Sequence, residues 1–500
     1  MRAEWATFRA SRGRVIAMLV ALLIPMAVGL ALTLTAQATC GKFDLATRTD
    51  IEEPCPPPVL GPGGQAVEDD FTFVHRSLRG DGSITARVTG MTGRIKEPPP
   101  PGTGAGPPPV PGLVPWAKAG VMVKDGIEQG SRYAAVMMTA GHGVRMQHDF
   151  TEDTAGSTGG FPRWLRLTRA GDTLTGFESP DGKRWTEVGT ARLDGLPETV
   201  EIGLFAASPG AVTMGGGGPE SRFTEATGVF DQVSPRAGDW TFDDIGVEME
   251  PDGVTPHHPG AFSRSGDEFV VTGVGDIAPA VAGQPIERTL IGGPVGLLVV
   301  IVVAVAYATS ERRRGALPAK AVVMGTAAFL AGVIPAAVVV PVSLAVLPSR
   351  GVHPLPVGLP AYLQVVVGTG LLFTAVAVLS LALGALIRRR AVAVVAAVAA
   401  VVLPYVLALA GVGEWLLVFT PAAGFAIQQS VPEYAHMEDV HLPIMGYFPL
   451  PPWAGFGVLC AWAALFLWAA IASARRPMTG TPTPEREEAW TPGWRANSGS

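Results

Sequence analysis

The chain has 500 residues, of which 48% are hydrophobic and 16% charged, and it carries a formal net charge of −6. Its length allows two or three domains, and few charges with a positive mean hydropathy are typical of a protein that is part soluble and part membrane-embedded. The slightly acidic balance, without a basic face outside the helix flanks, argues against nucleic acid as a partner.

The first apolar run, residues 15–36, follows an N-terminal segment, 1–14, that carries four arginines. Ala36 and Ala38 resemble a signal-peptidase cleavage site, but the run exceeds the roughly 7 to 15 residues of a signal-peptide core. We therefore predict an uncleaved transmembrane helix with a cytoplasmic N-terminus, and a cleaved secretory signal is the alternative. Both place the next segment, 37–288, outside the cytoplasm.

Two of the three cysteines, Cys40 and Cys55, bracket a short polar stretch directly after this run. If that stretch is extracellular they can form a disulfide that closes a loop of about 15 residues. The sequence leaves the pairing open. Cys460 lies inside the last apolar run, where we expect it to be packing, and no paired CxxC motif predicts zinc.

Much of 37–288 alternates apolar and polar residues over short runs, as half-buried strands do. We predict strands at 83–89, 121–124, 133–139, 144–148, 164–169, 174–178, 185–188, 199–205, 240–247 and 268–272. Segment 179–183 between two of them predicts a hairpin turn, because Gly182 can adopt positive φ. So many short strands predict an all-β sandwich or jelly roll with a core at about 69–280. The Pro-rich segment 98–115 is expected in an exposed loop.

Several of these segments resemble the concanavalin A-like (laminin-G-like) jelly-roll domains found as extracellular appendages in bacteria. The resemblance rests on 69–71 (DDF), 80–88 (GDGSITARV), 116–125 (WAKAGVMVKD), 164–167 (WLRL) and 179–185 (SPDGKRW). It covers about 69–209, and 238–279 completes the domain. Relatives of this shape can bind carbohydrate, but no sugar-binding residue set carries over to this chain.

Some residues of this region are candidates for binding. Trp116, Trp164 and Trp185 could offer stacking faces to the sugar rings of an extracellular glycan, and core or edge packing is the alternative. Asp69, Asp70 and Asp81 could hold calcium, although aspartates that cap turns are commoner. We expect no enzymatic activity, no metal and no cofactor.

Five further apolar runs contain no Asp, Glu, Lys or Arg, and each is near or above the about 20 residues that cross a bilayer. They are 290–308, 321–347, 362–387, 391–412 and 453–474. Arginine clusters at 312–314, 388–390 and 475–476 all fall on the cytoplasmic side if every run is a span. We predict a re-entrant or interfacial hairpin at 414–429, an outer loop at 432–452 and a disordered cytoplasmic tail at 477–500.

The predicted fold class is therefore mixed. An all-α membrane domain of six transmembrane helices carries an all-β jelly-roll sandwich inserted between helices 1 and 2. The five-helix part spans 289–476. This layout predicts a multi-pass protein of the plasma membrane, in contact with lipid, whose large domain is extracellular.

Residues 292–476 resemble the permease subunits of ABC-2-type ABC transporters, particularly actinobacterial ones. The matching stretches are 309–312 (TSER) leading to 319–323 (AKAVV), then 381–388 (LALGALIR) and 421–424 (PAAG). The resemblance implies a cytoplasmic ATP-binding subunit as partner and a permease homodimer or heterodimer. Family members usually carry a longer basic segment between the second and third spans, which seats on the ATPase. Here 314–318 is short.

The candidate ATPase-coupling residues lie beside this short loop: Glu311, Arg312, Arg313, Arg314 and Lys320. The alternative is that they only fix the topology. The chain has no GxxxxGK[ST] loop and so cannot hydrolyse ATP by that route. Its apolar runs also lack the ionisable groups that bind a coupling ion. We therefore expect a permease that moves an unidentified substrate with energy from a separate ATPase. The alternative is a membrane-anchored extracellular glycan- or ligand-binding protein without transport activity.

Overall fold

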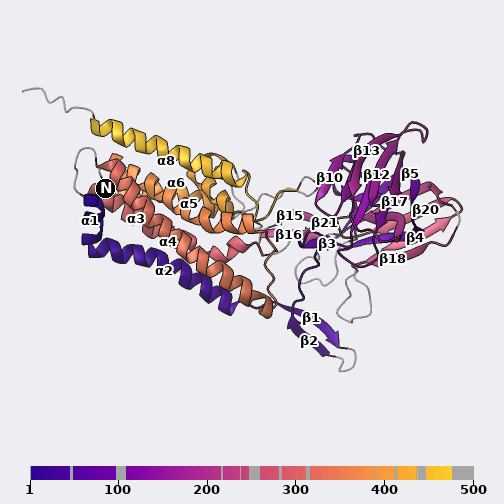
Figure 1. Cartoon of the computed structure of the whole chain (residues 1–500), viewed down its shortest axis with the longest axis horizontal. Coiled ribbons are helices and arrows are strands. Elements are labelled where there is room, and N and C mark those ends of the chain that lie inside the picture. Colours follow the sequence, from indigo (N-terminus) through magenta and orange to yellow (C-terminus); the bar gives the residue numbers. More distant parts are fainter. Residues whose placement is uncertain are drawn as a thin grey trace, which may run out of the picture.

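The computed structural model contains an elongated bundle of helices and a β-rich part beyond one end of it (Figure 1). It describes residues 2–44, 49–96, 108–215, 218–236, 238–246, 260–280, 284–310, 316–387, 389–409, 413, 415–434, 436 and 446–475. We call the end of the bundle next to the sheets its sheet-side end and the other its far end. The prediction of a mixed protein with apolar helices and antiparallel sheets is confirmed.

The bundle is built from apolar helices that match the predicted runs to within a few residues. The α-helices are α1 (Arg2–Ala10), α2 (Arg12–Thr35), α3 (Gly293–Thr309), α4 (Leu317–Val346), α5 (Leu359–Leu386), α6 (Arg390–Leu409), α7 (Leu416–Phe419) and α8 (Pro452–Arg475). The 3₁₀ helices are η1 (Ile286–Leu290), η2 (Leu347–Arg350) and η3 (Pro421–Gln428). In the described part of the chain, α2, α4, α5, α6 and α8 are long and apolar enough to cross a membrane, whereas α3 is apolar but has 17 residues.

Helix α5 lies inside the bundle, in contact with α3, α4, α6, α8 and η3. Two glycines allow this close packing. A Cβ on Gly332 of α4 would lie 2.8 Å from the carbonyl oxygen of Thr369, and one on Gly384 of α5 would lie 2.9 Å from Cα of Val305. Small residues at helix contacts let backbones approach, which favours association in lipid. These two glycines therefore let α5 approach both α4 and α3 closely.

The strands of the β-rich part are all antiparallel. Their bounds are β1 (Thr39–Asp44), β2 (Thr49–Pro54), β3 (Val67–Asp69), β4 (Phe71–Arg79), β5 (Gly82–Ile95), β6 (Val110–Pro111), β7 (Lys118–Lys124), β8 (Tyr133–Thr139), β9 (Gly143–His148), β10 (Glu152–Ala155), β11 (Arg163–Ala170), β12 (Thr173–Ser179), β13 (Thr186–Arg192), β14 (Thr199–Ala207), β15 (Ala211–Gly215), β16 (Gly218–Arg222), β17 (Thr224–Ser234), β18 (Thr241–Ile245), β19 (Ala261–Ser265), β20 (Glu268–Gly273) and β21 (Ile277–Pro279).

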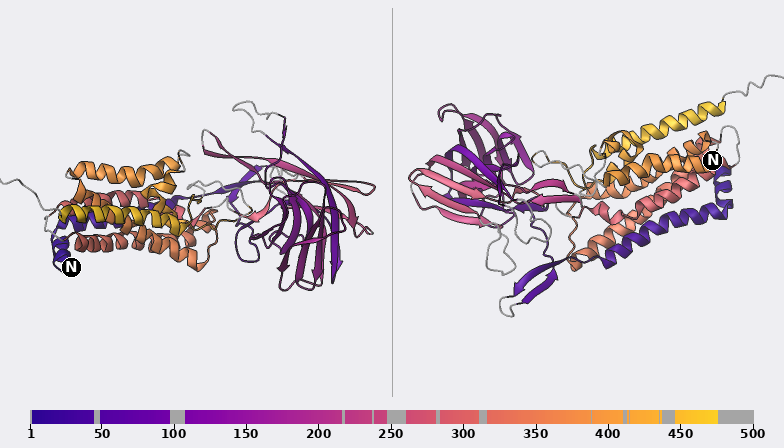
Figure 2. Two further views of the ribbon diagram at one scale, coloured as in Figure 1. Left: turned by 90° about the horizontal axis from the view of Figure 1, so that it is seen from above. Right: turned by 180° about the vertical axis from the view of Figure 1, so that it is seen from behind.

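Two large sheets face each other across one apolar core (Figure 2). One sheet has the order β10-β9-β8-β7-β14-β4-β18, and the other β13-β12-β11-β5-β17-β20-β19 with β6 beside β5. Every predicted strand is present, although the one at 240–247 is described only to Ile245 as β18. The predicted turn is also confirmed, since Gly182 has φ +69° and the Asp181 carboxylate accepts bonds from the N–H groups of Lys183 and Arg184.

Strands β7 and β8 are buried on both faces, whereas strands such as β11 are half-buried. The reason is a third layer. The short ribbon of β3 and β21 lies over the outer face of the β7 sheet, and together they enclose a second apolar cluster that contains Phe71, Met122 and Phe150. Strands that are covered on both faces have nearly continuous apolar sequences. The ribbon also joins the sheets to the bundle, because β3 follows α2 and β21 precedes η1.

Cys40 and Cys55 form a disulfide at the base of the β1–β2 hairpin, which projects beside the sheet-side end of α2 (Figure 1). The base of the hairpin is fixed to the bundle. The N–H of Cys55 donates to the carbonyl of Ala38 at 3.2 Å, and Nε2 of His353, from the loop between η2 and α5, donates to the carbonyl of Cys55 at 2.8 Å. The hairpin thus connects the end of α2 to the loop that joins α4 and α5.

Candidate functional site

A polar cluster surrounds Tyr307 of α3 at the far end of the bundle. The ring of Phe8 meets the ring of Tyr307 edge-on at 5.2 Å, and the guanidinium of Arg14 lies 5.0 Å from its centroid. The hydroxyl of Tyr307 donates to Oε2 of Glu4 at 3.1 Å. Through these contacts α1, which lies across the end of the bundle (Figure 1), is fixed to α2 and α3.

Lys320 belongs to the same cluster and is buried, with 4% of its surface exposed. Its ammonium lies 5.1 Å from the centroid of the Tyr307 ring and donates to the carbonyls of Tyr307 and Ser310. These carbonyls end α3, where a positive charge is favourable. The ammonium of Lys320, one of the candidate coupling residues, thus closes the connection from α3 to α4.

The other candidate coupling residues lie outside the described residues. They are Glu311, Arg312, Arg313 and Arg314. The described chain ends at Ser310 on one side of them and resumes at Ala316 on the other. Ser310 and Ala316 both lie at the far end of the bundle, next to the Tyr307 cluster.

Segment 415–430, which covers most of the predicted re-entrant or interfacial hairpin, packs against α5, α6 and α8 through η3. Nε1 of Trp462 donates to the carbonyl of Phe419 at 2.9 Å. Trp462 stands ten residues after the start of α8, which places this contact about 15 Å from the sheet-side end. Helix η3 then packs closely on α8, where a Cβ on Gly455 would lie 2.4 Å from the carbonyl of Ala423.

Polar side chains gather where η3 ends. Nε2 of Gln364 donates to the carbonyl of Gln429 at 3.0 Å, and Nε2 of Gln428 donates to Oγ1 of Thr369 at 2.9 Å. Elsewhere in the bundle, the hydroxyl of Ser343 in α4 hydrogen-bonds that of Thr33 in α2 at 2.6 Å. The bond from Gln364 satisfies a backbone carbonyl at the non-helical end of η3, as chain inside an apolar bundle requires.

Glu287 of η1 is the acidic member of this polar region. Its carboxylate accepts from the N–H of Ser430 at 3.2 Å and from the hydroxyl of Ser430. The sequence pattern assigned Glu287 to the outer domain, because the apolar run begins only at Leu290. Since η1 packs below the ends of its neighbours, the structure places a carboxyl group inside the bundle that hydropathy alone did not detect.

His436 connects the bundle to the sheets. This residue lies between η3 and α8, is 1% exposed, and donates from Nε2 to the carbonyl of Phe150 at 2.7 Å. Phe150 is fully buried and has φ +70°, a conformation that a bulky residue keeps only when its surroundings impose it. Burial, and next the charge of Lys118, lower the pKa of His436 to about 4. The sheets are thus held by a neutral imidazole.

Two buried ion pairs hold the β3–β21 ribbon to the same sheet. Nζ of Lys124 lies 2.8 Å from Oδ2 of Asp69, and Nζ of Lys118 pairs with Asp276. The two lysines stand at opposite ends of β7, so the ribbon is fixed on both sides. Asp69 is therefore engaged by Lys124 rather than placed for calcium.

The three predicted stacking tryptophans do not form one surface. Trp116 is 4% exposed, and His142 stacks on it at 3.9 Å. Trp185 is covered by the guanidinium of Arg166 at 3.9 Å. Trp164 lies near Arg87, at 5.8 Å, on the outer face of the second sheet.

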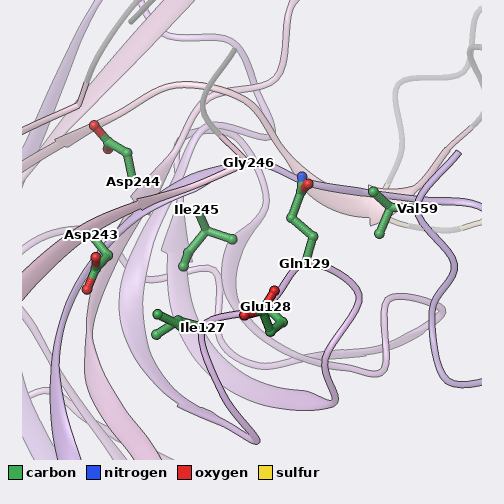
Figure 3. Close-up of a pocket in the computed structure, with 8 residues that line it drawn as sticks. All are labelled: Val59, Ile127, Glu128, Gln129, Asp243, Asp244, Ile245 and Gly246. Atoms are coloured by element: carbon green, nitrogen blue, oxygen red, sulfur yellow. The ribbon is translucent and has the colours of Figure 1, made fainter. Parts of the chain in front are cut away.

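A pocket of about 390 Å³ opens beside the β7 sheet (Figure 3). It is lined by Val59, Ile127, Glu128, Gln129, Asp243, Asp244, Ile245 and Gly246. Two of its carboxylates already have partners: Asp243 pairs with His75 at 2.8 Å, and Asp244 accepts from the N–H of Gly260 at 2.9 Å. Over the described ranges no group of three metal-ligating side chains occurs.

Comparison with known proteins assigns no family. No family model and no curated protein matches the chain. Among solved structures, one described as "The crystal structure of a functionally unknown protein from Saccharomyces cerevisiae" is 16% identical, with 38% of this chain and 84% of that chain covered and a TM-score of 0.18.

Proposed function

We propose that this protein is the permease subunit of an ABC-2-type transporter of the plasma membrane, with six membrane-crossing helices and an extracellular jelly-roll domain. One observation carries the proposal: apolar helices enclose the re-entrant segment formed by α7 and η3. The PAAG stretch that supports the resemblance begins η3, and LALGAL ends α5. We take these positions, at a packed internal segment and at the end of the central helix, as support for a permease over a simple membrane anchor.

The charges of the bundle support this orientation. Arg12 begins α2, while Arg389 and Arg390 precede or begin α6, so all three stand at the far end. Arginines collect on the cytoplasmic side of membrane proteins. The disulfide-bonded hairpin stands at the opposite end, and disulfides persist outside the cytoplasm. A partner ATPase would then meet the far end, near the Tyr307 cluster and the loop 311–315.

The test is purification of the full chain in mild detergent from its native host, followed by identification of proteins that co-purify. We expect a protein with a phosphate-binding loop to accompany the wild type, and to be lost from the triple variant Arg312→Glu, Arg313→Glu, Arg314→Glu. Arg350→Glu, at the sheet-side end, is the matched control and should retain the partner. If no ATPase accompanies the wild type, a membrane-anchored binding protein becomes the better interpretation.

A further inference from the structure

We propose that α1 and the start of α2 form a binding surface for the headgroups of anionic phospholipids in the cytoplasmic leaflet. The surface consists of Arg2, Trp5 and Arg9 of α1 and Arg12 of α2, and we call it the arginine edge. The inference rests on the orientation in the proposed function, which makes the far end of the bundle cytoplasmic, and it names a further partner there.

Contacts on another side of α1 fix how this helix lies across the far end of the bundle (Figure 1). Phe8 is buried, and its ring meets the ring of Tyr307 at 5.2 Å. Glu4, one turn before Phe8, accepts a hydrogen bond from the hydroxyl of Tyr307 at 3.1 Å. Glu4 is the one acidic residue among the first 36. The carboxylate nearest in sequence to the arginines is therefore engaged by α3, and α1 cannot rotate without losing these contacts.

The α1 part of the arginine edge combines two cations with an aromatic ring. Arg2, Trp5 and Arg9 follow one another at intervals of three and four residues, so they lie along one side of the helix. Arg2 and Arg9 are exposed, and the guanidinium of Arg9 lies 5.5 Å from the centroid of the Trp5 ring. Tryptophan is enriched at membrane interfaces, and the arginine fork matches phosphate geometry. The composition of this side therefore suits a headgroup layer.

Arg12 shows the depth at which the arginine edge meets the bilayer. It is exposed and shares one face of α2 with Ile16, Leu19 and Leu23, which are 59%, 51% and 49% exposed. An exposed apolar stripe on a membrane helix contacts acyl chains. Arg12 stands about 6 Å beyond Ile16, and the headgroup layer on each side of the hydrocarbon core is about 5 to 7 Å thick. The guanidinium of Arg12 is therefore at headgroup depth.

The charges of the arginine edge have no counter-ion among the described residues. Each arginine ion pair in the described chain joins two residues of the β-rich part. A phosphate group supplies the missing negative charge and can accept two N–H groups of one guanidinium. Anionic lipids attract basic residues that lie at the membrane surface. The position of Arg12 directly beyond an acyl-facing stripe favours lipid over the acidic surface of a soluble protein.

The experiment measures energy transfer to lipids in nanodiscs that contain the full chain. A donor dye is attached at Ala6→Cys, an exposed position of α1, with Cys460→Ser as background. The acceptor is a trace of phosphatidylglycerol or phosphatidylcholine, labelled in the acyl chain, in a phosphatidylcholine bilayer. We expect transfer to phosphatidylglycerol to be roughly threefold or more above transfer to phosphatidylcholine. This excess should fall at about 1 M salt, because exposed charges are then screened.

The triple variant Arg2→Gln, Arg9→Gln, Arg12→Gln should lose the excess. Its transfer to phosphatidylcholine should stay the same, which shows that α1 keeps its position. The triple variant Arg2→Lys, Arg9→Lys, Arg12→Lys should retain most of the excess, because the positive charges remain at the same depth.

The matched control removes three exposed arginines from the sheets: Arg79→Gln, Arg184→Gln, Arg192→Gln. It should keep the full preference for phosphatidylglycerol. Equal transfer from both lipids in the wild type, an unchanged preference in the glutamine variant of the arginine edge, or an equal loss in the control would each overturn the inference. If the edge variant loses a co-purified ATPase while neither lipid is preferred, the arginines contact a protein instead. The lipid measurement needs no ATPase, so its failure is distinguishable from failure of the co-purification.

Discussion

At the scale of single residues, the buried pair Asp69–Lys124 makes a direct prediction. Both side chains are fully buried, and they join β3 to β7. Removing one member leaves an uncompensated buried charge, which costs about 3–5 kcal/mol. We expect Asp69→Asn and Lys124→Met each to lower the opening free energy of the β3–β21 ribbon by this amount, and the double variant to lower it by less than the sum.

Amide hydrogen exchange of segments 67–69 and 277–279 in the full-length protein measures this opening. The exposed pair Arg79–Glu198 provides the control, because both side chains are mostly in solvent. Glu198→Gln should change exchange by less than about 1 kcal/mol. Strictly additive effects of Asp69→Asn and Lys124→Met would show that the two groups do not interact energetically.

Individual residues differ in how far the sequence reveals them. The turn glycine Gly182 was predictable because local backbone geometry demands it. Glu287 was not, since hydropathy places it beyond an apolar run and only packing shows that η1 lies inside the bundle. The pattern also did not reveal that Lys320 is buried, with its ammonium bonded to the carbonyls that end α3. Burial of a charge depends on partners that are remote in sequence.

At the scale of elements, two glycines of α8 differ in a useful way. A Cβ on Gly455 would lie 2.4 Å from the carbonyl of Ala423 in η3, whereas one on Gly457 would meet nothing within 4 Å. We expect Gly455→Ala to displace the re-entrant segment and destabilise the protein by about 1–3 kcal/mol. Gly457→Ala should be neutral or stabilise by up to about 1 kcal/mol, because alanine favours the helix.

Thermal unfolding in detergent, followed by tryptophan fluorescence, compares the two variants directly. Trp462 reports on the segment because its indole N–H bonds the carbonyl of Phe419. A lower midpoint and altered emission are expected for Gly455→Ala alone. Equal midpoints for both variants would mean that η3 does not pack on α8 as described.

Helices and strands were largely predictable wherever one sequence pattern dominates a segment. Alternation located strands such as β11 and β14, and apolar length located α4, α5 and α8. The pattern did not reveal that β7 and β8 are covered on both faces, because the covering ribbon of β3 and β21 comes from distant segments. The predicted run 290–308 begins earlier than the helix, because Leu290 belongs to η1 and α3 starts only at Gly293.

At the scale of the whole molecule, the arrangement of sheets and bundle could not be predicted, since it depends on a few contacts between remote segments. An apolar cluster joins Ala66 and Ala280 of the ribbon region to Leu355 and Val431 of the bundle. His436 adds a hydrogen bond to Phe150 from the segment before α8. These contacts fix the sheets against the sheet-side end (Figure 2).

This attachment is expected to weaken in acid. The pKa of His436 is lowered to about 4 by burial and then by Lys118, from an ordinary value of 6.5. The attached state therefore binds fewer protons than the detached state as pH falls from 6.5 to about 4, and attachment loses on the order of 3 kcal/mol over that window. Above pH 6.5 both states hold neutral imidazole, so this contribution no longer changes.

Glu68 of β3 titrates in the opposite sense, because burial, and then Asp276 and Asp70, raise its pKa to about 7. The contribution of Glu68 to attachment is therefore greatest below pH 4.5 and declines as pH rises towards 7.

Comparing the wild type with His436→Gln cancels the contribution of Glu68, which both proteins share. Glutamine can donate a hydrogen bond to the carbonyl of Phe150 without titrating. With spin labels at Thr190→Cys in β13 and Ser349→Cys in η2, the distance distribution should broaden in acid more strongly for the wild type. The same broadening in both proteins would show that protonation of His436 does not control the attachment.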